Sequence, residues 1–274
     1  MSDFGGDRFA TGLAVTAGVD IVVFAATWAL ARRRGRYNIV DVTWGLAILA
    51  ITGTAFGWST ATSGDTTRRV LVLVMTAAWA LRLAWHIAAR NRGHGEDPRY
   101  AAILRKAPGS VPLYAIRRVF LPQAVIAFGV SMPQQVAMYQ RGSRPALDII
   151  GAALFVIGLG FEATADAQLA RFIRTRSGSH EVMDHGLWRY SRHPNYFGES
   201  VLWFGLWLPA AGDWRGQLTV IAPVVVTYLV GFATGKPMLE KGMAKRKPAY
   251  AAYMAKTSGF VPLPPRRLRP TVPE

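Results

Sequence analysis

The sequence predicts an all-α, polytopic integral membrane protein with about seven transmembrane helices. Three observations lead to this fold class. The 274 residues are 51% hydrophobic and only 18% charged, whereas soluble domains usually carry about 25% charged residues. Apolar runs cover most of the chain, and several reach the length of about 20 residues that a spanning helix needs. Basic residues concentrate in alternate loops between these runs, as they do in membrane proteins of fixed orientation.

Seven apolar runs are candidate spans. The fourth contains Pro122 and Pro133, and proline removes a backbone donor, so a kink or a partly re-entrant segment is expected there. The sixth run is short. No basic segment precedes the first run, so a cleaved signal peptide is not indicated. In chain order the predicted spans are Ala10–Ala31, Ile39–Trp58, Val70–Ala89, Val119–Met138, Leu147–Ala165, Phe197–Ala211 and Leu218–Thr234.

The distribution of Lys and Arg predicts the orientation. Residues 32–36, 90–118, 171–192 and the segment from Lys236 onward hold 25 of the 32 basic residues, and the opposite loops hold six. The positive-inside rule then places the N-terminus outside and the C-terminus in the cytoplasm. An even number of spans would break this alternation, which favours seven.

Composition also limits the classes of function. Residues 1–262 are expected to form one membrane domain, followed by a Pro- and Arg-rich cytoplasmic tail, 263–274. The absence of cysteine excludes disulfides and thiolate metal sites. His180 and His185 lack the spacing of a zinc helix, so no metal site is predicted. In a membrane protein a net charge of +16 indicates orientation signals and anionic ligands rather than nucleic acid.

Ionisable residues within the predicted spans are candidate functional groups, because each costs a few kcal/mol on insertion scales. Asp41 lies near the start of the second span, and Arg82 and His86 share one face of the third. The alternative is structural: Arg82 could pair with Asp20 or Asp41 as a tie between helices.

The stretch Gly186–Glu199 combines two Arg, one His, two Tyr and one Asn at a membrane boundary. Pro194 fixes a turn there, and Gly198 permits close approach of a ligand to the backbone. A basic loop on lipid headgroups would explain part of this pattern. The mixture of donors and acceptors favours a ligand with phosphate and ribose groups.

Three further polar clusters fall on the same predicted side: Arg90–Tyr100, Asp166–Arg176 and Lys236–Tyr253. All could converge on one anionic cofactor, although attraction to anionic lipid accounts for some of their charge. Neither a Gly-x-Gly-x-x-Gly turn after a strand nor a P-loop is present, so a nucleotide site would be neither of the Rossmann nor of the Walker type.

The motifs together resemble the steroid 5α-reductase superfamily and, within it, bacterial membrane proteins of the DUF1295 group. The resemblance covers roughly residues 36–262 and implies a seven-helix bundle in the bacterial inner membrane. It also implies NADPH-dependent reduction of an activated C=C bond in a lipophilic substrate, such as a Δ4-3-oxosteroid or a related enone. The motifs are Tyr37–Gly45, Arg92–Tyr100, Leu187–Glu199, Lys236–Glu240 and Tyr250–Tyr253.

The resemblance also implies where NADPH binds, namely at the end of the fifth helix and in the two C-terminal basic segments. Asn195 is placed most firmly, because the pattern Asn-aromatic-x-Gly-Glu is present. The predicted cofactor-binding residues are Tyr37, Asn91, Arg92, Asp166, Arg171, Arg174, Arg192, His193, Asn195, Tyr196, Glu199, Lys236, Glu240, Lys241, Tyr250 and Tyr253.

The predicted catalytic residues are Asp41, Arg82 and His86. In the steroid reductases a Glu of the second helix and a Tyr of the third hold the 3-oxo group. Here the second helix offers Asp41, and the third offers no Tyr. We therefore expect Arg82 or His86, oriented by Asp41, to polarise the enone oxygen, because negative charge develops there in the transition state. The predicted substrate-binding residues are Trp44, Trp79 and Trp85.

Two alternatives stay open from the sequence. Membrane methyltransferases of the isoprenylcysteine and phospholipid type, which use S-adenosylmethionine, share the Arg-His-Pro-x-Tyr-x-Gly-Glu pattern and a similar tail. The Tyr37–Gly45 motif and the excess of Arg, which suits a 2′-phosphate, favour the reductase. A non-enzymatic membrane protein is the third possibility, against which the ligand-like loops argue.

Overall fold

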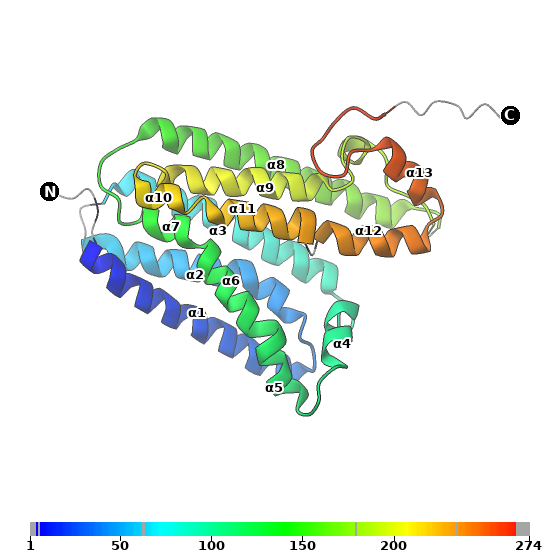
Figure 1. Ribbon diagram of the computed structural model, residues 1–274, viewed down its shortest axis with the longest axis horizontal. Helices are drawn as coiled ribbons and strands as arrows, with labels where there is room; N and C mark the ends of the chain where they lie inside the picture. The colour runs from blue at the N-terminus through cyan, green and yellow to red at the C-terminus, as the bar shows by residue number, and fades with distance from the viewer. Residues whose placement is uncertain (1–3, 5, 62–63, 179, 234, 267–274) are drawn as a thin grey trace. The chain divides into compact units, whose positions relative to one another are not determined.

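The computed structural model describes residues 4, 6–61, 64–178, 180–233 and 235–266. Within these ranges the regular elements are all helical, and the two β-bridges, Phe4–Gln140 and Ser191–Ser258, are isolated. The all-α prediction is therefore confirmed. Figure 1 shows the described helices. They divide into two compact units, and α8, α9 and α11 have residues in both. The first unit is Met1–Ile149 with Leu206–Ala222, and the second is Ile150–Gly205 with Pro223–Glu274.

The first unit is built around α2, which packs against both α1 and α3. Buried side chains of α2, such as Ile48 and Ile51, have no surface exposed to solvent. Large apolar side chains of α1 and α3, such as Val22 and Val74, are in contrast exposed, as expected for helices that face lipid. Its elements are α1 (Gly6–Arg34), α2 (Ile39–Trp58), η1 (Ser59–Ala61), α3 (Thr66–Asn91), α4 (Pro98–Leu104), α5 (Val111–Ala115), η2 (Ile116–Phe120), α6 (Leu121–Val130), α7 (Met132–Ala137), η4 (Leu208–Ala210) and α10 (Trp214–Leu218).

The second unit contains a close contact between α8 and α9. A Cβ atom added to Gly198 would lie 2.6 Å from the Glu162 nitrogen, and one added to Gly158 would lie 2.4 Å from the Leu202 nitrogen. Small residues at helix interfaces allow backbones to approach in this way. The elements with residues in this unit are α8 (Pro145–Thr175), η3 (Gly186–Arg189), α9 (Pro194–Trp207), α11 (Ile221–Tyr228), η5 (Leu229–Ala233), α12 (Gly235–Arg246) and α13 (Ala249–Lys256).

The chain after α13 runs alongside the loop before α9, and we call residues 257–263 the C-terminal strap. The Arg192 nitrogen donates to the Ser258 carbonyl at 2.9 Å, and the Leu263 nitrogen donates to the Tyr190 carbonyl at 3.0 Å. The Ser191 hydroxyl donates to the Phe260 carbonyl at 2.7 Å. These bonds fix the backbone of the loop that leads into α9.

Six described helical segments are long and apolar enough to cross a membrane, which confirms the membrane class. The sixth predicted span, Phe197–Ala211, is the exception. There α9 has 14 residues and extends about 21 Å, short of the roughly 30 Å hydrocarbon core, before η4 begins. Thr234 of the seventh predicted span and residues 267–274 of the predicted tail lie outside the described residues. The six segments are Arg8–Arg34, Ile39–Trp58, Thr66–Asn91, Val111–Ala137, Pro145–Thr175 and Trp214–Ala244.

Candidate functional site

A group of polar side chains surrounds Asp41 in the first turn of α2. The Tyr100 hydroxyl donates a hydrogen bond to Asp41 Oδ1, and Arg99 Nη2 donates to Asp41 Oδ2 at 3.1 Å. Gln123 Nε2 of α6 donates to the Tyr100 oxygen at 3.3 Å. We call these four residues the Asp41 group. Tyr100 is only 8% exposed, so a phenol and a carboxyl group meet in a largely buried position.

The electrostatics keep Tyr100 protonated. Burial, and then the charge of Asp41, raise the pKa of Tyr100 well above its usual range. Arg99 also binds Asp97, through Nε at 3.0 Å and Nη2 at 2.9 Å. Although burial raises the pKa of Asp97, these hydrogen bonds outweigh it and hold that pKa below its usual value. One guanidinium thus balances two carboxylates, and the phenol remains a hydrogen-bond donor.

Two separate sequence motifs build this group. Glu96 accepts hydrogen bonds from the backbone nitrogens of Tyr37 at 2.5 Å and Asn38 at 3.0 Å, at the start of α2. Asp97 caps α4 by accepting from the Arg99 nitrogen, and proline follows it, a combination typical of helix N-termini. The Tyr37–Gly45 and Arg92–Tyr100 motifs are therefore joined through Glu96.

Tyr100 is the residue that our sequence prediction missed. The resemblance implies a tyrosine on the third helix, but Tyr100 follows that helix, in the first turn of α4. The Asp97-Pro98 start signal could have revealed it.

Arg82 and His86 lie half-buried on α3, and their catalytic roles stay a prediction. The two oxygens of Asp41 accept from Tyr100 and Arg99.

The three predicted substrate-binding tryptophans occupy different environments. Trp79 is fully buried and packs edge-to-face on Trp44, with ring centroids 5.8 Å apart. Trp85 is 66% exposed, and the Arg92 guanidinium lies 5.2 Å from its ring centroid. Asn91, also predicted at the cofactor, accepts a hydrogen bond from Arg36 through its carbonyl. Trp79 therefore belongs to the interior and Trp44 is half-buried, whereas Trp85 and Arg92 lie at the surface.

In the second unit Glu240 of α12 binds the loop before α9. Arg192 Nε donates to Glu240 Oε1 at 2.8 Å, and His193 Nε2 lies 3.1 Å from the same oxygen. Arg192 Nη1 donates to the carbonyls of Met254 at 3.0 Å and Thr257 at 2.8 Å. We call Arg192, His193 and Glu240 the Arg192 group. Its hydrogen bonds join the loop, α12 and the strap.

His193 is buried within this group, with 4% of its surface exposed. Its ring stacks on Tyr196, with centroids 5.3 Å apart and planes within 4°. Burial lowers the pKa of His193, and the contact with Glu240 only partly opposes this effect. The imidazole is therefore neutral at neutral pH, so one ring nitrogen donates a hydrogen bond and the other accepts one.

Asn195 and Asp166 meet across the α8–α9 contact. Asn195 Nδ2 donates to Asp166 Oδ1 at 3.2 Å, and Asn195 Oδ1 accepts from the Tyr196 nitrogen at 3.0 Å. Glu199 lies one turn further along α9 and is half-buried. Arg171 and Arg174 were expected in a loop; they lie instead on α8, which continues to Thr175, and both are exposed.

Two cations converge beside Gly259 of the strap. A Cβ atom added to Gly259 would lie 2.9 Å from Lys236 Nζ and 3.2 Å from Arg192 Nη2. Among the described residues no carboxylate lies within 4.0 Å of the Lys236 ammonium. A glycine backbone flanked by an ammonium and a guanidinium suits a phosphate, because both cations form charge-assisted hydrogen bonds with its oxygens.

The remaining predicted cofactor residues lie on α12 and α13. The Tyr253 hydroxyl donates to the Trp188 carbonyl at 2.6 Å, so this side chain holds α13 on the loop before α9. Tyr250 packs on the Tyr253 ring with centroids 5.6 Å apart, and burial raises its pKa to about 12. Lys241 is exposed. Whether either tyrosine contacts a cofactor stays a prediction.

Comparisons with known proteins identify the family of the chain. The family described as "Protein of unknown function (DUF1295)" matches residues 27–257. An uncharacterized protein of Schizosaccharomyces pombe, C594.04c, is 26% identical over 225 residues, which cover 71% of this chain and 64% of that protein.

Two plant proteins named steroid 5-alpha-reductase DET2 match a shorter region of 68 residues. They come from Arabidopsis thaliana, with 31% identity, and Gossypium hirsutum, with 32%. Each match covers 25% of this chain and 26% of the relative. The chain therefore spans less than two thirds of the length of each of these three relatives. No solved structure matches.

Proposed function

The chain belongs to the DUF1295 family, within the steroid 5α-reductase superfamily, and from this premise we propose that it is an NADPH-dependent membrane reductase. Its proposed substrate is a lipophilic enone, such as a Δ4-3-oxosteroid, whose activated C=C bond is reduced. The apolar spans suit a substrate that reaches the protein from the bilayer.

The observation that carries the proposal is the hydrogen bond between Tyr100 and Asp41. The superfamily resemblance implies an acid of the second helix and a tyrosine at the 3-oxo group. The chain supplies the acid, Asp41, from its second helix, α2, but the tyrosine from α4 rather than from the third helix. Because Tyr100 donates to Asp41, we assign the polarising role to Tyr100, with Arg82 and His86 as the earlier candidates.

The pair can stabilise the charge that the reaction creates. When the β-carbon of an enone gains a hydride, the π electrons of the C=C bond shift towards the carbonyl group. The carbonyl oxygen then becomes a negatively charged enolate oxygen. A phenol held in a dry position stabilises that oxygen, because its dipole is already oriented before charge develops. The Tyr100 hydroxyl would rotate from Asp41 to donate to the substrate oxygen, while Arg99 remains hydrogen-bonded to Asp41. The α-carbon of the enolate then takes one proton from water, which leaves as hydroxide, and the product is the saturated ketone.

The residues of the second unit fit a phosphorylated dinucleotide. NADPH, when bound, supplies the hydride. Lys236 and Arg192 beside Gly259 suit one of its phosphates, and the exposed Arg171 and Arg174 suit the 2′-phosphate. Asn195, fixed by Asp166, offers an amide for a ribose or nicotinamide group.

A ligand-stabilisation experiment tests the proposal directly. The full-length chain, purified in detergent, would be heated with NADPH, NADH or S-adenosylmethionine. A ligand that binds only the folded state raises Tm according to its concentration relative to Kd. We expect the largest increase with NADPH, followed by NADPH oxidation that depends on an added enone such as progesterone.

The other outcomes are equally informative. Stabilisation by S-adenosylmethionine alone would refute the reductase and establish the methyltransferase alternative. Stabilisation by NADPH without oxidation by any of a panel of lipophilic enones would retain the cofactor and refute the substrate class.

A further inference from the structure

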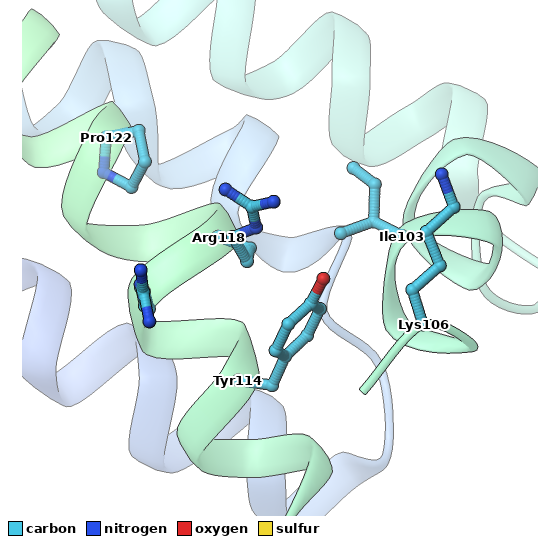
Figure 2. A pocket seen from close by; sticks show the side chains of 6 residues that line it. Ile103, Lys106, Tyr114, Arg118 and Pro122 are labelled. Carbon is cyan, nitrogen blue, oxygen red and sulfur yellow. The ribbon is translucent and has the colours of Figure 1, made fainter. Parts of the chain in front are cut away.

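The first unit contains a basic pocket that the proposed reaction does not use. Its volume is about 280 Å³, and it opens between α4 and the helical segment formed by α5, η2 and α6. Ile103 and Lys106 lie on one side, and Tyr114, Arg118 and Pro122 lie on the other (Figure 2). The lining residues are Ile103, Lys106, Tyr114, Arg117, Arg118 and Pro122.

The charge of this pocket is entirely positive. Its polar lining consists of one ammonium, two guanidinium groups and one phenol, and no acid lines it. Within the described part of the chain, no carboxylate lies within 4.0 Å of Lys106, Arg117 or Arg118. The Arg118 guanidinium instead lies 5.9 Å from the centre of the Tyr114 ring. Asp97, which precedes α4, is bound by Arg99.

The backbone that carries two of the lining residues is not a regular α-helix. Arg117 and Arg118 belong to η2, a π-helical turn within an otherwise α-helical segment. Such turns occur often at functional sites, because the extra residue per turn changes where side chains point. Here the turn brings two consecutive arginines to the base of an apolar span, Val111–Ala137.

Exposed apolar side chains continue from the pocket along the span. Leu121 and Val125, one and two turns beyond Arg117, are 55% and 64% exposed, and Leu113 is 65% exposed. A basic pocket next to an apolar surface of this kind matches an amphiphile with a phosphate headgroup and hydrocarbon chains. A soluble phosphate would use the cations but would gain nothing from the apolar side chains.

We propose that this pocket binds the phosphate of an anionic membrane lipid. Lys106, Arg117 and Arg118 would hold the headgroup by charge-assisted hydrogen bonds, and Tyr114 would add a neutral donor. The acyl chains would lie against Leu121 and Val125. The site is separate from the Asp41 group, although both use α4 and α6: Tyr100 precedes Ile103 on α4, and Gln123 follows Pro122 on α6.

The experiment compares three probes on the full-length chain in detergent: phosphatidylglycerol, phosphatidylcholine and inorganic phosphate. Native mass spectrometry counts bound lipid, and Tm reports its effect on stability. The test variant is Lys106→Gln/Arg118→Gln. The control is Arg33→Gln/Arg105→Gln, which removes the same charge from exposed positions outside the pocket.

We expect phosphatidylglycerol to bind the wild type and the control about equally. Each cation contributes about 1 kcal/mol, so affinity should fall about 30-fold in the test variant. Equal binding of phosphatidylglycerol and phosphatidylcholine, or an equal loss in both variants, would overturn the proposal. A response to inorganic phosphate that needs Lys106 and Arg118 would replace the lipid with a soluble phosphate. Because all four side chains are exposed, Tm without lipid should be the same in the three proteins.

Discussion

The Asp41 group and the Arg192 group contain similar side chains but use them differently. Around Asp41 the hydrogen bonds run from side chain to side chain: Tyr100 and Arg99 donate to Asp41, and Gln123 donates to Tyr100. Around Arg192 most bonds reach the main chain, at the carbonyls of Met254 and Thr257.

This difference suggests that the contacts of the Asp41 group can be exchanged for contacts with a ligand, whereas those of the Arg192 group hold the structure. A hydrogen bond between two side chains can be replaced by one to a ligand through a small rotation. A guanidinium that ties main-chain segments together cannot leave without disordering them, because each abandoned carbonyl would cost about 1–3 kcal/mol. We therefore expect the Asp41 group to govern turnover. Arg192 should hold the loop and also face a phosphate beside Gly259, while Lys236, Arg171 and Arg174 bind the cofactor alone.

Removal of the Tyr100 hydroxyl should have the largest effect. We expect Tyr100→Phe to lower kcat for enone reduction about 100- to 1000-fold, as for the loss of one oxyanion donor, and to leave NADPH affinity unchanged. Steady-state kinetics and cofactor titration measure the two quantities. Tyr228→Phe is the matched control, since Tyr228 is 59% exposed. Normal turnover in Tyr100→Phe would move the donor role back to Arg82 or His86.

The next largest effect should come from the α8–α9 contact. The methyl group of Gly198→Ala would meet the Glu162 nitrogen at 2.6 Å and the Gly158 carbonyl at 2.7 Å. Overpacking of this kind costs about 1–3 kcal/mol, so Tm in detergent should fall and Asn195 should move from Asp166. Gly160→Ala is the control on α8, because nothing lies within 4 Å of its added Cβ. Equal Tm values for the two variants would contradict the described contact.

A smaller effect is expected for Asn195→Ala. The substitution removes the hydrogen bond to Asp166 and the amide that we assign to the cofactor. We expect NADPH affinity to fall about tenfold, a loss of about 1.4 kcal/mol, with Tm of the unliganded protein nearly unchanged. Isothermal titration of NADPH provides the measurement, and wild-type affinity would remove Asn195 from the site.

The smallest effect should be a pH dependence of stability that originates at His193. Its pKa is lowered in the folded protein, so below pH about 6.5 the unfolded chain binds the proton more readily. Stability should therefore be complete above that pH and decline as the pH falls towards the folded-state pKa. Tm measured between pH 7.5 and 5.5 should decrease less in His193→Gln than in the wild type. Parallel curves would show that other groups govern the decline.

Hydropathy predicted the fold well where a helix coincides with an apolar run. The second predicted span, Ile39–Trp58, has the same bounds as α2. Helix ends were predicted less well, because polar residues also continue helices. Residues 166–175 are mostly good helix formers, and α8 therefore extends to Thr175 instead of ending at Ala165.

The sequence predicted many of the residues of the candidate site but not which of them contact one another. The sequence motifs contain Asp41, Arg192, Asn195 and Glu240, but Tyr100 was overlooked because it follows the third helix. The Arg192–Glu240 bond joins residues 48 positions apart, and no periodicity indicates such a pairing. Nor did any motif indicate the pocket around Arg118, because a π-helical turn has no reliable sequence pattern.

The glycines between α8 and α9 also bear on how the chain enters the bilayer. Gly198 and Gly205 on α9 are seven residues apart and face the backbone near Gly158 and Gly151 of α8. Since α9 has only 14 residues, it is shorter than the roughly 20 residues that an independent spanning helix needs. We expect it to be inserted as the second arm of a hairpin whose first arm, α8, is already in place. During biosynthesis, the glycines would thus determine when this segment can partition into lipid.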